Sequence, residues 1–146
     1  MARFTCSTAI KRPVEDVFSV LSDPANDPTW SSAVVEAEQT SPGPIGVGTT
    51  ARFVSKLLGR RIETDWEITE FEPNHRFVAL SKSRPFPLQV SMNFESAEGG
   101  TRVSVTYEAE PGGFLKLTVP LFVIMGKRQL QSALDNLKGL MEAKAL

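Results

Sequence analysis

The spacing of apolar residues changes twice along the chain, and this change is the feature that most limits how the chain can fold. Helical spacing over residues 14–21 gives way to alternation from about residue 31 to 110, and helical spacing then returns. Alternation places every second side chain on one face of a strand, whereas apolar residues three and four apart line one face of a helix. The pattern predicts a strand, a short helix, a series of strands and a long final helix.

Alternation is sharpest in three segments, residues 61–71, 87–95 and 101–110. In the first of them, apolar side chains such as Trp66 and Ile68 alternate with charged ones. Weaker alternation predicts strands near residues 4–10, 33–39, 49–58 and 75–82. Turn-forming residues separate neighbouring segments, so we expect an antiparallel meander with one apolar face and one face in water.

The final helix has a long apolar stripe, formed by Leu130, Ala133, Leu134, Leu137, Leu140 and Met141. A continuous helix from residue 114 to 146 would be roughly 50 Å long. A compact domain of this length has a diameter of roughly 40 Å. Proline disrupts a helix interior, so we expect a break at Pro120, with the long helix starting close to it.

Together these elements predict one domain over residues 1–146 with an α+β fold. A seven-stranded curved antiparallel sheet would wrap around the long C-terminal helix, with one or two short helices after the first strand. Strand twist curls a sheet of this size, and one helix roughly 10 Å wide cannot fill its concave side. We therefore expect a cavity between sheet and helix.

Charge and rare residues exclude several classes of function. The net charge is -1, with one His and one Cys. The chain has no stripe of basic residues that would predict a nucleic-acid partner. A single cysteine cannot form an internal disulfide, and the chain has too few His and Cys ligands for a zinc site. We expect neither metal nor cofactor. The first residues lack the order of a secretory signal, which predicts a cytoplasmic protein.

Several short motifs follow one another along nearly the whole chain. They are Pro-Val-Glu-Asp-Val-Phe at 13–18, Leu-Ser-Asp-Pro at 21–24, Trp30, Gly-Val-Gly-Thr at 46–49, Trp-Glu-Ile-Thr-Glu-Phe-Glu-Pro at 66–73, Gly-Thr-Arg-Val at 100–103 and Leu-Asp-Asn-Leu-Lys at 134–138. In order and spacing the chain resembles the START-like (SRPBCC) superfamily, in particular the polyketide cyclase/dehydrase and lipid-transport group with the helix-grip fold. The resemblance implies a pocket for a lipid, quinone, sterol or polyketide. It leaves the activity open, because the family includes carriers, cyclases, dehydratases and chaperone activators.

The expected ligand-binding residues lie on the apolar face of the sheet and around the start of the final helix. They are Phe53, Ser55, Thr64, Trp66, Phe77, Met92, Phe94, Val105, Tyr107, Phe114, Leu117, Leu121, Phe122 and Met125. Tyr107, Thr64 and Ser55 would orient the ligand, with Ser81 behind them. The expected cavity contains almost nothing that titrates near neutrality, and Tyr107 is its one candidate acid.

Three functions fit these residues. The first is a non-enzymatic carrier or binding module for a hydrophobic small molecule. The second is a cofactor-independent cyclase or dehydratase that uses Tyr107 and ordered water. The third is a protein-interaction or chaperone-activating domain that uses the apolar segment 114–125. That segment could cover the cavity mouth, touch a membrane without stable insertion, or pair with a second copy in a homodimer.

Other motifs have simpler interpretations. Residues 46–51 match the dinucleotide fingerprint G-x-G-x-x-A, but a strand follows them where the fingerprint needs a helix, so we expect a turn. His75 lies in a turn, where it is solvated, and Cys6 shares an apolar face and packs in the core. Carboxylates such as Glu63 lie on the wet face, where cross-strand charge pairing explains them.

Overall fold

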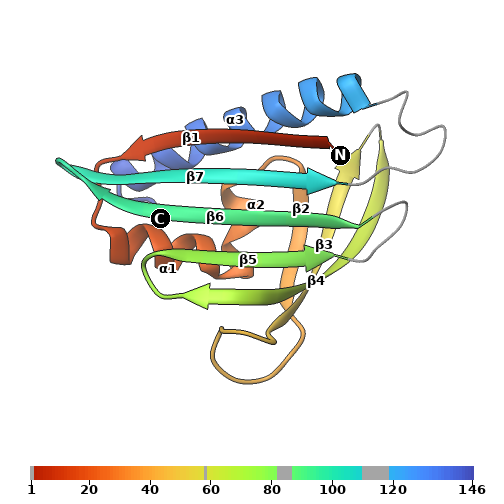
Figure 1. The fold of residues 1–146 in the computed structure, drawn as a ribbon, viewed down its shortest axis with the longest axis horizontal. Helices are drawn as coiled ribbons and strands as arrows, with labels where there is room; N and C mark the ends of the chain where they lie inside the picture. The colour runs from red at the N-terminus through yellow and green to blue at the C-terminus, as the bar shows by residue number, and fades with distance from the viewer. Residues whose placement is uncertain (1, 58, 82–86, 110–118) are drawn as a thin grey trace.

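A computed structural model describes residues 2–57, 59–81, 87–109 and 119–146, and it forms a curved sheet beside helices (Figure 1). The elements are β1 (Ala2–Ile10), α1 (Val14–Ser22), the short 3-10 helix η1 (Pro24–Asn26), α2 (Asp27–Trp30), β2 (Val34–Gln39), β3 (Thr50–Leu57), β4 (Arg60–Glu72), β5 (Arg76–Ser81), β6 (Leu88–Ala97), β7 (Gly100–Ala109) and α3 (Val119–Glu142). The predicted α+β helix-grip architecture is confirmed.

The seven strands form one antiparallel sheet in the order β1-β7-β6-β5-β4-β3-β2. Strands β2 to β7 are therefore the predicted meander, in which each strand pairs with its neighbour in the chain. Strand β1 completes the sheet by pairing along β7, from Ala2 opposite Ala109 to Ile10 opposite Thr101. The first strand thus lies at the opposite edge from β2.

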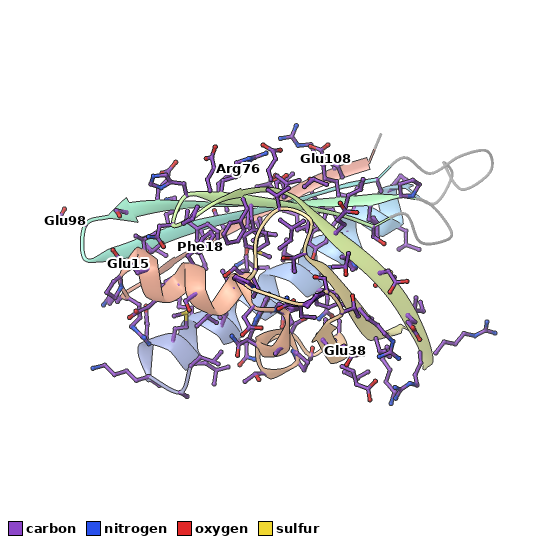
Figure 2. The ribbon with its side chains drawn as sticks, turned by 90° about the horizontal axis from the view of Figure 1, so that it is seen from below. Glu15, Phe18, Glu38, Arg76, Glu98 and Glu108 are labelled. Atoms are coloured by element: carbon purple, nitrogen blue, oxygen red, sulfur yellow. The ribbon has the colours of Figure 1, made fainter. Side chains whose placement is uncertain are left out.

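The convex face of the sheet is charged. Figure 2 shows Arg76 and Glu108 pointing outward from it, on the side away from the helices. Near the β2 edge, Arg52 Nε donates to Glu63 Oε1 at 2.7 Å and also lies within ion-pair distance of Glu36 and Glu38. The hydrogen bond from Arg52 lowers the pKa of the Glu63 carboxyl. The predicted cross-strand charge pairing is confirmed.

Within the described residues, the long helix α3 runs from Val119 to Glu142 and includes Pro120. The residues directly before Val119 lie outside the described part of the chain, so the expected break at Pro120 and a start of the helix close to it stay a prediction. The apolar stripe of α3 faces the interior, where Leu134, Leu137 and Met141 have no exposed surface.

Helix α1 fills one end of the concave side of the sheet. Its Phe18 lies beneath the sheet in Figure 2 and contacts three aromatic rings. The ring centroid of Phe18 is 5.3 Å from that of Phe71, 6.0 Å from Phe77 and 5.0 Å from Phe94. Next to this cluster, towards the other end, the described residues that face the sheet come from the end of α1, from the short η1 and α2, and from α3 between Gly126 and Ala133. The concave side is therefore densely packed at one end and less so at the other.

The remaining motifs take the positions expected from the sequence. Gly48 has a φ of 90°, which is a left-handed conformation that glycine adopts readily, and β3 begins two residues later. The Thr49 hydroxyl accepts a hydrogen bond from the Gly46 N–H at 2.9 Å and closes this turn. His75 is exposed, whereas Cys6 is 4% exposed and burial raises the pKa of its thiol.

The described parts of the chain contain neither a membrane-spanning helix nor a cluster of metal ligands. No helix there is long and apolar enough to cross a membrane. No group of three or more His, Cys, Asp or Glu side chains there could hold a metal ion.

Candidate ligand-binding cavity

A cavity of about 390 Å³ lies between the sheet, the segment containing η1 and α2, and helix α3. Its wall is mostly apolar. The lining residues are Phe4, Leu21, Ser22, Pro24, Asp27, Trp30, Ser31, Ala33, Val34, Thr49, Ala51, Phe53, Ser55, Lys56, Ile62, Thr64, Trp66, Ile68, Phe77, Ala79, Leu88, Val90, Met92, Tyr107, Gly126, Gln129, Leu130 and Ala133. The cavity occupies the part of the concave side that α1 does not fill.

One cross-strand row forms much of the sheet wall. Ile68, Ala79, Val90, Tyr107 and Phe4 lie opposite one another on β4, β5, β6, β7 and β1. All five line the cavity. Residues directly opposite on neighbouring antiparallel strands share one face, so the register alone brings these distant positions together. Two small side chains in this wall, Ala79 and Ala51, help to leave the space open.

Most of the expected sheet residues lie on the cavity wall, namely Phe53, Ser55, Thr64, Trp66, Phe77, Met92 and Tyr107. Phe94 does not, because it packs against Phe18 in the aromatic cluster at the other end. Val105 is also absent from the wall and is fully buried. It lies opposite Cys6, whose Sγ is 3.5 Å from the Lys127 carbonyl oxygen, so α3 covers this part of the sheet.

The expected residues from segment 114–125 have other positions. Phe114 and Leu117 lie outside the described residues, and Phe122 belongs to α3 but its side chain is not described. Leu121 and Met125 are 59% and 46% exposed and do not line the cavity. Among the side chains that the structure describes, α3 contributes to the wall from Gly126 onward.

Tyr107 is the most central polar group on the sheet wall. Its ring stacks on Phe4 with a centroid distance of 5.4 Å, and its hydroxyl forms no hydrogen bond with the described residues. Dense apolar surroundings raise the pKa of Tyr107 to about 12, and the nearby Asp27 carboxylate contributes to this rise. The hydroxyl therefore keeps its proton at physiological pH and is available as a donor.

The other expected polar groups differ in whether they line the cavity and in whether they already have a hydrogen-bond partner in the protein. The Thr64 hydroxyl accepts a hydrogen bond from Trp66 Nε1 at 3.0 Å, so it has a protein partner. Ser81 is 1% exposed and is not on the cavity wall. Ser55 lines the cavity and is partly exposed.

The structure contradicts the expectation that the cavity holds almost nothing that titrates near neutrality. Asp27, the first residue of α2, lines the wall, and burial raises the pKa of its carboxyl to about 8. The indole N–H of Trp30 opposes this rise in pKa, whereas the negative charge of Asp23 adds to it. This carboxyl group is mostly protonated at neutral pH.

Two buried polar atoms beside the cavity have no hydrogen-bond partner within the described part of the chain. They are Asp27 Oδ1 and Trp30 Nε1. The indole N–H is close enough to Asp27 to influence its carboxyl, but the two groups do not form a hydrogen bond of good geometry. Buried polar groups are usually satisfied, so this pair marks a place where a ligand could supply the missing partner.

The cavity reaches the surface where its lining residues are exposed. Lys56 on β3, Ile62 on β4 and Gln129 on α3 all line the cavity and are exposed. Among the described residues, the cavity is therefore open to solvent near the end of β3, the start of β4 and the middle of α3.

Comparison with known sequences places the chain in a family. Residues 1–142 match the family model described as polyketide cyclase / dehydrase and lipid transport. An uncharacterized protein of Mycobacterium tuberculosis is 28% identical over 134 residues, which cover 89% of this chain and 78% of that protein. An uncharacterized protein of Mycobacterium bovis gives the same values.

Solved structures share the fold over nearly their whole length. The protein TTHA0849 from Thermus thermophilus has a TM-score of 0.83 and 21% identity, with 99% of each chain covered. A START superfamily protein from Mycobacterium smegmatis has a TM-score of 0.79 and 13% identity, covering 98% of this chain and 99% of that one. At these identities the likeness concerns the fold alone.

Proposed function

Because the chain belongs to the polyketide cyclase/dehydrase and lipid transport family, we propose that it binds a hydrophobic small molecule in the cavity, as a carrier or binding module. The observation that carries this proposal is the cavity of about 390 Å³ with its mostly apolar wall. Ligand sites are typically apolar concavities of this kind with a few polar groups that fix orientation.

The apolar wall can provide enough affinity without a charged anchor. Burying roughly 300 Å² of apolar ligand surface gives about 7 kcal/mol at 25 cal/mol per Å². Loss of ligand freedom offsets part of this energy, so we expect dissociation constants in the micromolar range. Tyr107 and Ser55 would orient the ligand within this apolar space.

The direct test combines dye binding with a variant that fills the cavity. Ala79→Leu adds apolar volume to the sheet wall, whereas Ala143→Leu adds the same volume at an exposed position after α3. The apolar dye N-phenylnaphthylamine should bind the wild type and the Ala143 variant equally and the Ala79 variant roughly tenfold more weakly. Equal binding by all three proteins, or no binding by the wild type, would contradict the proposal.

A cyclase or dehydratase is the second candidate, and Asp27 is the observation that favours it. A carboxyl group that stays protonated near neutrality can donate a proton to the departing hydroxyl group of a β-hydroxy ketone, while a water molecule takes the α-proton, so that a C=C bond forms and water leaves. Since burial raises the pKa of Asp27 to about 8, dehydration of a β-hydroxy ketone should slow as pH rises through that value. Turnover that is unchanged in both Asp27→Asn and Tyr107→Phe would exclude this candidate.

A further inference from the structure

Three polar groups line the mostly apolar cavity from two sides. Asp27 and Trp30 belong to α2, and Tyr107 belongs to β7 in the sheet wall. The Asp27 carboxyl contributes to the raised pKa of Tyr107, and the Trp30 indole in turn opposes the rise in the pKa of Asp27. We call these three residues the polar cluster of the cavity.

Two atoms of the polar cluster lack a hydrogen-bond partner within the described protein. Asp27 Oδ1 and Trp30 Nε1 are buried and unsatisfied, and Trp30 as a whole is only 5% exposed. Leaving a buried polar group without a partner destabilises the protein, because the group has lost its hydrogen bonds to water. Such a cost in a family of ligand-binding folds points to a partner that arrives with the ligand.

The chemistry of the cluster is rich in donors. The indole N–H can only donate, a phenolic hydroxyl with a raised pKa donates readily, and a protonated carboxyl donates through its hydroxyl. A ligand oxygen that accepts hydrogen bonds satisfies these groups, whereas a ligand cation would meet a carboxyl that mostly carries no charge at neutral pH. The occupant that fits is a carbonyl oxygen.

We propose that Asp27 and Tyr107, with the Trp30 indole beside them, form a donor site for the carbonyl oxygen of a hydrophobic ketone or quinone. This inference rests on the proposed binding function and names its ligand class. Two donors from opposite walls would hold the oxygen while the apolar remainder fills the space towards Phe53 and Ile62. Binding of one oxygen by a tyrosine and a protonated carboxylic acid in an apolar site is an established arrangement in proteins.

A matched pair of ligands tests the site without any substitution. Benzophenone and diphenylmethane have the same two rings, but only benzophenone has a carbonyl group. Net hydrogen-bond energies predict that the wild type binds the ketone about tenfold more tightly. The carbonyl carbon of isotopically labelled benzophenone should also shift downfield in NMR spectra of the complex, relative to benzophenone in an alkane. Equal affinities or an unshifted resonance would overturn the donor site, whereas binding of neither ligand would contradict the proposed function itself.

Variants then assign the donors. Tyr107→Phe keeps the ring but loses the hydroxyl and should reduce the ketone preference severalfold. Asp27→Leu should also reduce the ketone preference severalfold. Asp27→Asn keeps an N–H donor and should preserve the ketone preference. Glu67→Gln, an exposed position on β4, is the control and should change nothing. A full ketone preference in both Tyr107→Phe and Asp27→Leu would refute the assignment.

The pH dependence of ketone affinity tests the role of Asp27 as a donor, because a merely structural role would not produce it. The titratable groups around Asp27 are Asp23 before η1, Tyr107 on β7 and, at the mouth, Lys56 on β3. Ketone affinity should be constant below about pH 8, where Asp27 carries its proton, and fall above it. The decline should be absent for diphenylmethane and in Asp27→Asn. A decline that persists in Asp27→Asn would overturn the role of this carboxyl.

Discussion

At the scale of single residues, Asp27 destabilises the fold in two ways. Its carboxyl group is removed from water and has an oxygen without a partner in the described part of the chain. Burial disfavours the charged form, so the folded protein holds a proton that the unfolded chain releases near its ordinary pKa of 3.8. The free energy of unfolding therefore decreases as pH rises. The same burial gives the cavity a carboxyl group that is mostly neutral near pH 7.

Asp27→Asn should change how stability depends on pH. The pKa of Asp27 is raised from 3.8 to about 8 on folding, so its contribution is favourable below the lower value and disappears as pH approaches the upper one. The variant should be more stable than the wild type by roughly 1–3 kcal/mol at about pH 9, relative to the difference at about pH 4. Urea unfolding of both proteins at the two pH values measures this effect.

The exposed carboxylate Glu67 on β4 provides the control, because Glu67→Gln should leave the pH profile of stability unaltered. Parallel pH profiles for the wild type and Asp27→Asn would mean that Asp27 is an ordinary carboxylate.

Sequence reasoning found Tyr107 but not Asp27, and the reason is physical. Tyr107 belongs to a ten-residue strand whose alternation fixes the face of every side chain. Asp27 belongs to a four-residue helix in a segment rich in proline and acidic residues. Apolar residues do not repeat there over enough positions to predict which way a side chain points. The one available clue is a helical spacing of three between Asp27 and Trp30.

At the scale of elements, helix α3 carries two glycines with different surroundings. A Cβ added at Gly126 would lie 2.7 Å from the Phe4 ring, whereas nothing lies within 4 Å of one added at Gly139. Gly126 therefore allows the helix to approach β1 closely beside the cavity. Gly139 has no such packing role and only lowers the helical propensity.

The same substitution at these glycines should have opposite effects. Gly139→Ala should raise the free energy of unfolding by about 1 kcal/mol through helix propensity. Gly126→Ala should lower it by about 1 kcal/mol and weaken ligand binding, because Phe4 must move towards Tyr107. Chemical denaturation and dye titration of the two variants measure both effects. A stabilised Gly126 variant with unchanged binding would show that the helix does not approach β1 this closely.

Arg12 connects the first elements to the end of α3. Its Nη1 donates to the carbonyl oxygens of Met141 at 2.8 Å and Leu146 at 3.0 Å, and Asp16 accepts from the same guanidinium at 3.0 Å. The last carbonyls of a helix have no partner within the helix, and a positive charge there is favourable. Arg12 is thus a C-terminal cap supplied from another element.

Arg12→Ala should lower the free energy of unfolding by about 2 kcal/mol, since charge-assisted hydrogen bonds to part-buried carbonyls are lost. Arg12→Lys should recover only part of this loss, because an ammonium group lacks the planar fork. Arg3→Ala is the control, as its 3.7 Å ion pair with Glu108 is largely exposed and should contribute little. If Arg3→Ala lowered the free energy of unfolding as much as Arg12→Ala, the effect would come from removing a positive charge and not from capping α3.

Element boundaries were predictable wherever a period extended over many residues. The strands and α3 have the predicted order. The placement of Phe94 was less predictable, since alternation gives its face but not its position along that face. Only the packing of Phe18 from α1 decides that Phe94 belongs to the aromatic cluster and not to the cavity.

At the scale of the whole molecule, an occupied cavity should stabilise the fold. A ligand at a hundredfold excess over its dissociation constant adds about 2.7 kcal/mol. For a chain of this length, this energy should raise the melting temperature by roughly 5–10 °C. Thermal unfolding with N-phenylnaphthylamine should show the increase in the wild type and a smaller one in Ala79→Leu. A ligand that binds without raising the melting temperature would have to bind the unfolded chain as well, and an equal increase in Ala79→Leu would place its site outside the cavity.

The pairing of β1 with β7 also has a consequence for synthesis. Thr5 and Thr106 share a hydrogen bond across a separation of 101 residues, and Arg12 bonds to a carbonyl 134 positions away. Contacts between such distant positions make folding slow. A nascent chain therefore exposes its apolar concave face until α3 has left the ribosome. A ligand or chaperone that binds this face early would therefore change the yield of folded protein.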